Sequence, residues 1–256
     1  MNRRTVLVTG SAGTMGRQVV EALLEAGHHV RGIDLRPTPG LENAFVGNLQ
    51  DSQTFGAAME GVEVVVHLAA TPDEADFLSE LLPNNIVGVY HVFDQARRQK
   101  VQRLIFASST QVVWGLLEEG TRLPVRVDDP YAPRTHYAAA KIFAEAMGQL
   151  YSSRYGLQVV AVRPGWMPRN PEHAASGIRH PIVRDLYLSP RDAGRFFRLA
   201  VEAEELPPYC VLYAASITRR TLIDLEPAER LIGYRPKDRY PEGIPFSVPE
   251  APPDAV

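Results

Sequence analysis

Short runs of consecutive apolar, often β-branched residues alternate along the chain with longer segments in which apolar residues recur every three or four positions. The short runs are typical of strands buried on both faces, and the longer segments are typical of helices with one apolar side. Met15, Val19 and Leu23 share one such side before Gly27 ends the segment. The pattern predicts strands at Thr5–Thr9, His29–Asp34, Val62–Ala69, Arg103–Ser109 and Leu157–Arg163.

The repetition of strand, helix and strand predicts the fold class. Right-handed crossovers place helices on alternate faces of a parallel sheet, so we expect an α/β fold with a doubly wound parallel sheet in a single domain, 1–256. Five prolines from Pro164 to Pro190 predict loops in that part of the chain. We expect a small C-terminal substrate lobe built mainly from 165–190 and 217–246.

Two further elements and a tail are expected toward the C-terminus. Ser189 is predicted to cap a helix that runs to Leu206, and residues 209–216 are predicted to form another strand. Residues 251–256 are expected to be a frayed tail. In the first half, Pro83 is expected to break the segment 75–100 and to begin a new helix.

Composition narrows the possible functions. With 256 residues and 45% hydrophobic content, the chain is long and apolar enough to form a folded core. Its 27 Lys+Arg and 30 Asp+Glu residues give a net charge of -3, which offers no basic surface to nucleic acid or to an anionic membrane. We therefore expect a small-molecule partner. The single cysteine, Cys210, and the lack of an apolar leader before Thr5 favour the cytoplasm.

A glycine-rich loop follows the first predicted strand and opens the first helix, with glycines at Gly10, Gly13 and Gly16. Such glycines allow a tight turn and a close approach of the backbone to a pyrophosphate, while the helix N-terminus attracts negative charge. Asp34 ends the next strand, where a carboxylate accepts the ribose hydroxyls of NAD and repels the 2′-phosphate of NADP. We therefore predict NAD as the cofactor, with Arg36 as the feature that would favour NADP.

Tyr137 and Lys141 are four residues apart, so they lie on one face of a predicted helix. A phenol with the ordinary pKa of ~10 is a poor base at neutral pH, but a neighbouring ammonium favours the phenolate. The chain has only three lysines, which argues against a chance pair. Ser108 and Ser109 end a predicted parallel strand, at the edge where such sheets bind ligands.

With these motifs the chain resembles the extended short-chain dehydrogenase/reductases, also called NAD-dependent epimerase/dehydratases, which have a Rossmann-like fold. The resemblance covers about residues 5–216. It rests on Gly10-x-x-Gly13-x-x-Gly16, Asp34, Asn48-Leu49 with Asp51, His67-Leu68-Ala69-Ala70, Asn85-x-x-Gly88, Ser108-Ser109, Tyr137-x-x-x-Lys141 and Arg163-Pro164-Gly165.

The resemblance implies roles for individual residues. Ser109, Tyr137 and Lys141 would be catalytic, Asp34 would hold the adenosine ribose, and Lys141 would also bind the nicotinamide ribose. The full set of implied cofactor contacts is Gly10, Ala12, Gly13, Thr14, Met15, Gly16, Asp34, Asn48, Leu49, Leu68, Ala69, Ala70, Asn85, Tyr137, Lys141 and Pro164.

Within this family the chain is most similar to the uronate dehydrogenases, which oxidise the anomeric carbon of galacturonate or glucuronate to an aldarolactone. It departs from their pattern around the substrate, at Thr110-Gln111 and at Pro164-Gly165-Trp166. We expect hydride transfer to NAD+ from a hydroxyl-bearing carbon of a sugar or sugar acid. The expected substrate contacts are Thr71, Ser109, Thr110, Gln111, Tyr137, Arg179 and Arg184.

Three other functions compete with this one. A sugar-nucleotide epimerase or dehydratase would use the same tyrosine and lysine, but such chains usually need a larger C-terminal lobe. A non-catalytic dinucleotide sensor would keep the glycine loop, yet the presence of Ser109 together with Tyr137 and Lys141 counts against it. Metal-dependent hydrolysis has little support, because the histidines lack carboxylates at ligand spacing, and we predict no metal site.

The resemblance also suggests a homodimer. The helix that follows Pro83 and the helix that carries Tyr137 would each pair with their copies in a second chain. Apolar positions permit this pairing, although packing on the sheet would explain some of them; these positions are Ile86, Val89, Phe93, Phe143 and Met147.

Overall fold

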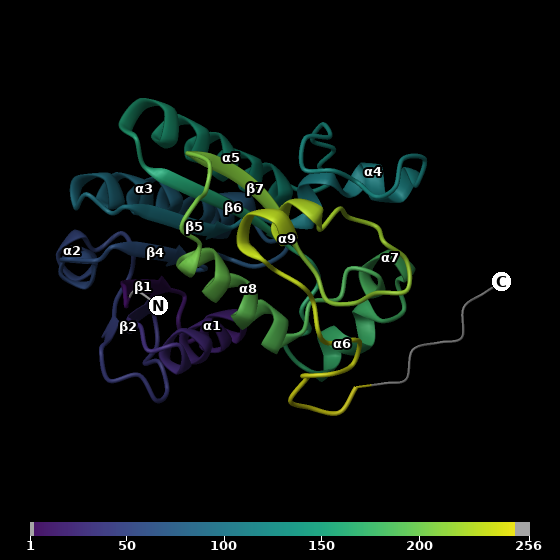
Figure 1. The fold of residues 1–256 in the computed structure, drawn as a ribbon, viewed down its shortest axis with the longest axis horizontal. Helices are drawn as coiled ribbons and strands as arrows, with labels where there is room; N and C mark the ends of the chain where they lie inside the picture. Colours follow the sequence, from purple (N-terminus) through teal and green to yellow (C-terminus); the bar gives the residue numbers. More distant parts are fainter. Residues whose placement is uncertain (1–2, 249–256) are drawn as a thin grey trace.

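The computed structural model describes residues 3–248, and within them seven strands form one parallel sheet (Figure 1). The strand order is β3-β2-β1-β4-β5-β6-β7, which confirms the predicted doubly wound α/β fold. The predicted tail at residues 251–256 lies outside the described residues. The strands are β1 Thr5–Thr9, β2 His29–Asp34, β3 Ala44–Val46, β4 Val64–His67, β5 Arg103–Ala107, β6 Gln158–Pro164 and β7 Tyr209–Ala214.

Helices connect the strands and build the region beyond their carboxyl ends. A π-helix, η1, spans Phe77–Val87, and a 3-10 helix, η2, spans Thr110–Val113. The α-helices are α1 Thr14–Glu25, α2 Ser52–Met59, α3 Gly88–Arg98, α4 Trp114–Glu119, α5 His136–Tyr155, α6 Pro171–Gly177, α7 Pro181–Arg184, α8 Pro190–Glu202 and α9 Glu226–Ile232. No helix within residues 3–248 has both the length and the apolarity that crossing a bilayer requires.

Helices cover both faces of the sheet, and successive strand residues alternate between the two layers. Val6 and Val8 of β1 pack with α1, α8 and α9, whereas Leu7 packs with α2, α3 and α5. Figure 1 shows α3 and α5 on one side of the sheet and α1 and α8 on the other. Side chains on both faces of β1 are fully buried, as the apolar runs predicted.

A third group of buried apolar residues lies outside these two layers. It joins Val112, Val113 and Leu117 with Tyr213 and with residues of the segment 186–223. Part of this group comes from the expected substrate lobe, and part comes from the segment 112–125, which was not assigned to the lobe. Residues that follow β5 therefore contribute to the apolar core beyond the strands.

Pro83 does not break its segment as predicted. It lies inside η1, which runs directly into α3, and the Gly88 amide donates to the Pro83 carbonyl five residues earlier. In an α-helix a proline lacks the amide that bonds the carbonyl four residues earlier, and its ring collides with that carbonyl. The wider π-helical turn accommodates the ring without ending the helix.

The loop prediction for residues 164–190 is also wrong in part, because α6 and α7 lie there. Each of these helices begins with a proline, Pro171 in α6 and Pro181 in α7. Proline is well suited to a first helical position, since the amide it lacks would have no helical partner there. The short strand β3 and helix α2 were not predicted at all; Asp51 caps α2 by accepting from the amides of Gln53 and Thr54.

Close packing of α1 against α8 gives a stability prediction. A Cβ added at Gly194 in α8 would lie 2.7 Å from the Gln18 carbonyl oxygen of α1, whereas a Cβ at Gly56 in α2 meets nothing within 4 Å. Gly194→Ala should lower the free energy of unfolding by about 1–3 kcal/mol through overpacking. Gly56→Ala should raise it by about 0.5–1 kcal/mol, because glycine is a poor helix former. Urea unfolding measures both, and equal shifts in one direction would contradict this packing.

Candidate active site

A cavity of about 1120 Å³ opens at the carboxyl ends of β1, β4, β5 and β6. The chain leaves β1 toward β2 on one side, while β4 lies on the other side, so the sheet has its switch point between β1 and β4. Open α/β sheets bind ligands in the crevice at this point. The cavity therefore lies where the topology alone would place a nucleotide.

The glycine loop forms one wall of the cavity. Gly10 has a φ of +72°, and a Cβ there would lie 2.7 Å from the amide nitrogen of Ala69 at the end of β4. A Cβ at Gly16 would collide with the Gly10 carbonyl oxygen. The N-cap of α1 is Gly13, which supplies no side-chain cap for the first amides of the helix. This helix N-terminus without a side-chain cap, beside a glycine-rich loop, fits the pyrophosphate of a dinucleotide.

Asp34 lies beside this loop at the end of β2. Its carboxylate accepts from the amides of Ala12 and Arg36, each at 3.1 Å, and Asp34 also lines the cavity. Ala12 itself is not among the described residues that line the cavity. The remaining predicted cofactor contacts line the cavity except for Asn85; they are Gly10, Gly13, Thr14, Met15, Gly16, Asn48, Leu49, Leu68, Ala69, Ala70, Tyr137, Lys141 and Pro164.

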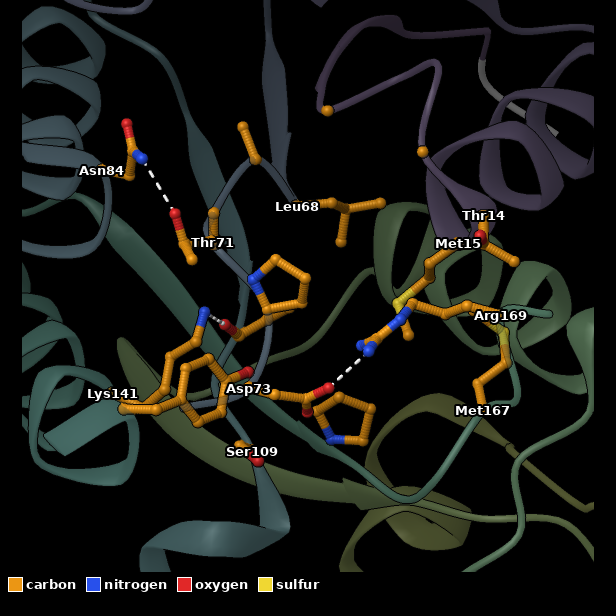
Figure 2. A pocket seen from close by; sticks show the side chains of 18 of the residues that line it. Thr14, Met15, Leu68, Thr71, Asp73, Asn84, Ser109, Lys141, Met167 and Arg169 are labelled. Carbon is orange, nitrogen blue, oxygen red and sulfur yellow. Dashed lines mark hydrogen bonds and ion pairs between the residues drawn. The ribbon is translucent and has the colours of Figure 1, made fainter. Parts of the chain in front are cut away.

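Asn85 lies outside the lining of the cavity. It is 1% exposed, and its side chain accepts from the Thr71 amide at 2.8 Å and donates to the Thr71 carbonyl at 3.0 Å. Asn85 thus fixes the loop after β4, and its neighbour Asn84 lines the cavity in its place. The Asn84 amide donates to the Thr71 hydroxyl, a contact visible in Figure 2.

The three predicted catalytic residues meet in the cavity. Lys141 on α5 donates to the Ala107 carbonyl at the end of β5 at 2.9 Å, and its Nζ lies 5.4 Å from the centre of the Tyr137 ring. The hydroxyls of Tyr137 and Ser109 are hydrogen-bonded. Thr135 caps α5 by accepting from the Ala138 amide, so the reactive tyrosine lies in the first turn of its helix.

Burial sets the acid strengths of Tyr137 and Lys141. Burial raises the pKa of Tyr137, with a further rise from the negative charge of Asp73, while the hydrogen bond with Ser109 lowers it. Burial lowers the pKa of Lys141 to about 8. Lys141 therefore remains mainly protonated at pH 7 and can release its proton near that pH. Two proton-exchanging groups with shifted pKa values in one cavity are typical of a catalytic site.

A buried polar network holds α5 to the strand ends. Arg163 of β6 and Glu145 of α5 form an ion pair at 2.8 Å, and both side chains are almost fully buried. Glu145 also accepts from the Ser108 hydroxyl at 2.6 Å and from the Tyr131 hydroxyl at 2.9 Å. Glu145 follows Lys141 by one helical turn, so this network places the helix that carries both Tyr137 and Lys141.

The predicted substrate contacts divide into two groups. Thr71, Thr110 and Gln111 line the cavity together with Ser109 and Tyr137. Arg179 and Arg184 are not among the described residues that line it. Arg179 is exposed between α6 and α7 and Arg184 ends α7, whereas His173, Ser176 and Gly177 of α6 line the cavity.

Four charged residues in the cavity were missed by the sequence interpretation, namely Asp73, Glu80, Arg134 and Arg169. Asp73, from the loop after β4, and Arg169, from the segment after β6, form an ion pair across it (Figure 2). Both lie in irregular segments where no periodicity marks a side chain, and only their position after parallel strands could have indicated them. Within residues 3–248 no cluster of three or more His, Cys, Asp or Glu residues is arranged to hold a metal ion.

Comparison with known proteins identifies the family. The sequence profile of the NAD dependent epimerase/dehydratase family matches residues 6–172. The chain belongs to this family. This result confirms the predicted extended short-chain dehydrogenase/reductase type and its use of NAD. The Rossmann-like fold is confirmed by the crystal structure of uronate dehydrogenase from Agrobacterium tumefaciens, which is 26% identical, with a TM-score of 0.77, covering 93% of this chain and 86% of that chain.

Two similar proteins are named as sugar-type dehydrogenases. An L-arabinose 1-dehydrogenase (NAD(P)(+)) from Haloferax volcanii is 34% identical over 91% of this chain and 96% of its own length. A uronate dehydrogenase from Pseudomonas syringae is 30% identical over 91% of this chain and 82% of its own length. These relatives confirm the prediction of an NAD-dependent dehydrogenase that acts on a sugar or sugar acid.

MoeE5, which was solved in complex with UDP-glucuronic acid and NAD, has a similar fold, with a TM-score of 0.77 at 22% identity. The match covers 93% of this chain and 96% of that chain. At this identity the likeness shows the shared fold.

Burial of Lys141 gives a prediction about stability and pH. Its pKa falls from 10.5 to about 8 on folding, so the unfolded chain binds more protons between these values and stability rises with pH across that window. Lys141→Met removes this cost but leaves the Ala107 carbonyl without its donor. At pH 7 the free energy of unfolding of Lys141→Met should be about 2–3 kcal/mol higher than that of the wild type. This difference should shrink above pH 8.

Urea unfolding at pH 7, 8, 9 and 10 measures this difference. Lys237→Met is the matched control, because Lys237 is exposed and its replacement should change the free energy little at any pH. A Lys141→Met variant that is less stable than the wild type at pH 7 would contradict the cost of burying the ammonium.

Proposed function

We propose that this chain oxidises the C1 hydroxyl of a sugar in its cyclic form, or of the corresponding sugar acid, to a lactone with NAD+. The observation that carries the proposal is the meeting of Ser109, Tyr137 and Lys141 beside the glycine loop in one cavity. The relatives named as arabinose and uronate dehydrogenases support C1 as the reacting carbon.

The roles of the side chains follow from their chemistry. The Ser109 and Tyr137 hydroxyls bind the C1 hydroxyl of the sugar, and Tyr137 takes its proton as the C1–O bond becomes a carbonyl. NAD+, when bound, supplies the acceptor for the hydride that leaves C1. The ammonium of Lys141 holds the ribose next to the nicotinamide and favours the phenolate of Tyr137.

The other end of the cavity favours NAD over NADP. Asp34 presents a carboxylate whose two oxygens already accept from backbone amides, so it is held in place next to the loop. This carboxylate accepts from the hydroxyls of an adenosine ribose and repels a 2′-phosphate. Arg36 also lines the cavity and would lessen the repulsion of a 2′-phosphate. Activity with NADP+ is therefore measured beside activity with NAD+.

Removal of the Tyr137 hydroxyl tests the proposal directly. Tyr137→Phe should abolish NADH formation, by at least a thousandfold in kcat, because no other group at this position can take the C1 proton. NAD+ binding, measured by calorimetry, should stay within about threefold of the wild type, because the glycine loop and Asp34 are unchanged. A fully active Tyr137→Phe protein would show that Tyr137 is not the base.

The substrate class is measured by the absorbance of NADH at 340 nm. The panel contains aldoses, uronates, polyols and UDP-sugars, each tested with NAD+ and with NADP+. We expect NADH formation with aldoses or uronates. An epimerase or dehydratase returns its hydride and releases no net NADH, so the UDP-sugars are also examined for converted product by chromatography. Conversion of UDP-sugars alone would favour the epimerase or dehydratase alternative, and tight NAD+ binding without any conversion would favour the dinucleotide sensor.

We further propose that the protein works in the cytoplasm as a homodimer formed by α3 and α5. Of the positions considered from the sequence, Val89 and Phe93 are buried in the core of the chain, and Phe143 and Met147 pack against that core. The exposed apolar side chains on these helices are different ones: Tyr90, Leu150 and Tyr155 are 48%, 45% and 46% exposed. These side chains would form the contact between two copies.

Light scattering at micromolar concentration tests this assembly. The wild type should have about twice the mass of the 28.4 kDa chain. Tyr90→Lys combined with Leu150→Lys should give a folded monomer, because two cations on each side of a symmetric contact repel each other. A monomeric wild type would remove the dimer.

A further inference from the structure

The ion pair between Asp73 and Arg169 limits which substrates the cavity can take. Figure 2 shows the two side chains pointing toward each other across the pocket, with Asp73 on the side of Ser109 and Lys141. Both charges act on Tyr137, and that of Asp73 acts more strongly than that of Arg169. A substrate bound at Tyr137 therefore meets the carboxylate of Asp73 before the guanidinium of Arg169.

The loop that carries Asp73 is held in place on several sides. Glu74 accepts from the Tyr137 amide and from His136 at the start of α5, and Asn85 holds Thr71 at the other end of the loop. Asp73 has a φ of 61°, a left-handed conformation that aspartate tolerates better than most residues. The carboxylate is thus part of a preformed wall, and moving it away would disturb the start of the catalytic helix.

The other cations at this end of the cavity are also engaged. Arg134 pairs with Glu118 at 3.2 Å, and Lys141 donates to a backbone carbonyl. Burial and the charge of Arg169 lower the pKa of His173, so its ring is neutral at pH 7. A second carboxylate, Glu80, accepts from the Thr71 hydroxyl and also lines the cavity. Among the described lining residues at this end, Arg134, Arg169 and Lys141 thus each already have a partner.

We propose that Asp73 neutralises Arg169 and makes the cavity specific for uncharged sugars over uronates. This inference rests on the proposed function and narrows its substrate class. A uronate would have to separate the ion pair and place its own carboxylate next to Asp73, whereas the hydroxyls of a neutral sugar can donate to Asp73 with the pair intact. Asp73 is then a specificity-determining residue, and it acts by repelling the wrong substrate.

Three sugars provide a matched series for the test. L-Arabinose, D-galactose and D-galacturonate share the configuration of the pyranose ring and differ only in the substituent at C5, which is hydrogen, a hydroxymethyl group or a carboxylate. The ratio of kcat/KM for galacturonate to that for galactose isolates the effect of the charge. We expect this ratio to be below about one tenth for the wild-type protein with NAD+.

Asp73→Asn should raise that ratio by at least about tenfold, because it removes the negative charge and frees Arg169. Asparagine tolerates the left-handed conformation as well as aspartate does, so the loop keeps its shape. Adding Arg169→Met to this variant should abolish the gain. Glu80→Gln is the control for a general loss of negative charge, since Glu80 is bonded to Thr71 and not to Arg169, and it should change the ratio less than about threefold.

The outcomes separate the two proposals. A wild-type protein that prefers galacturonate, or an Asp73→Asn variant with an unchanged ratio, overturns the role of Asp73 while the proposed function stands. If Asp73→Asn and Glu80→Gln raise the galacturonate-to-galactose ratio equally, the role of Asp73 is overturned as well. The ratio would then depend on the total charge of the cavity and not on the ion pair. If none of the three sugars reduces NAD+ while UDP-sugars are converted, the proposed function fails, and the inference fails with it.

Discussion

The buried ion pair between Arg163 and Glu145 determines where the chemistry can occur. It joins β6 to α5 inside the protein, and the hydroxyls of Ser108 and Tyr131 satisfy the remaining capacity of the carboxylate. Removing one partner of such a pair leaves an uncompensated buried charge, which costs about 3–5 kcal/mol. Because Lys141 lies one turn before Glu145, the same contacts bring the lysine to the end of β5. The alignment of the reactive helix with the strand ends follows from this network.

The parallel sheet is the second constraint, because the carboxyl ends of the strands that carry the site residues all lie at one edge of the sheet. The glycine loop after β1, Asp34 at the end of β2 and Ser109 after β5 therefore line one continuous cavity although they are far apart in sequence. In the proposed function, binding of the adenosine and proton transfer use opposite ends of that cavity. The Asp73 and Arg169 pair lies at the reactive end and gives it a surface that suits hydroxyl groups better than a second anion.

Much of this site could be predicted from the sequence because its signals are local. A glycine loop between strand and helix, and a tyrosine four residues before a lysine, each define their own geometry. The outcomes for Asn85, Arg179 and Asp73 depended on tertiary structure instead. Asn85 holds the loop after β4, and Arg179 is exposed between α6 and α7. Asp73 meets Arg169 although the two residues are 96 positions apart in the sequence. No short-range pattern encodes such contacts, and the π-helix around Pro83 shows the same limit for the backbone.

Isotope transfer tests the central claim, which is that the cavity removes hydride from C1 of a sugar while Tyr137 takes the hydroxyl proton. The protein is incubated with NAD+ and L-arabinose deuterated at C1, and the reduced cofactor is examined by mass spectrometry. The account predicts reduced cofactor that carries one deuterium, together with a slower single-turnover rate than with unlabelled sugar. Unlabelled NADH would show that the hydride comes from another carbon and would contradict this account of the site.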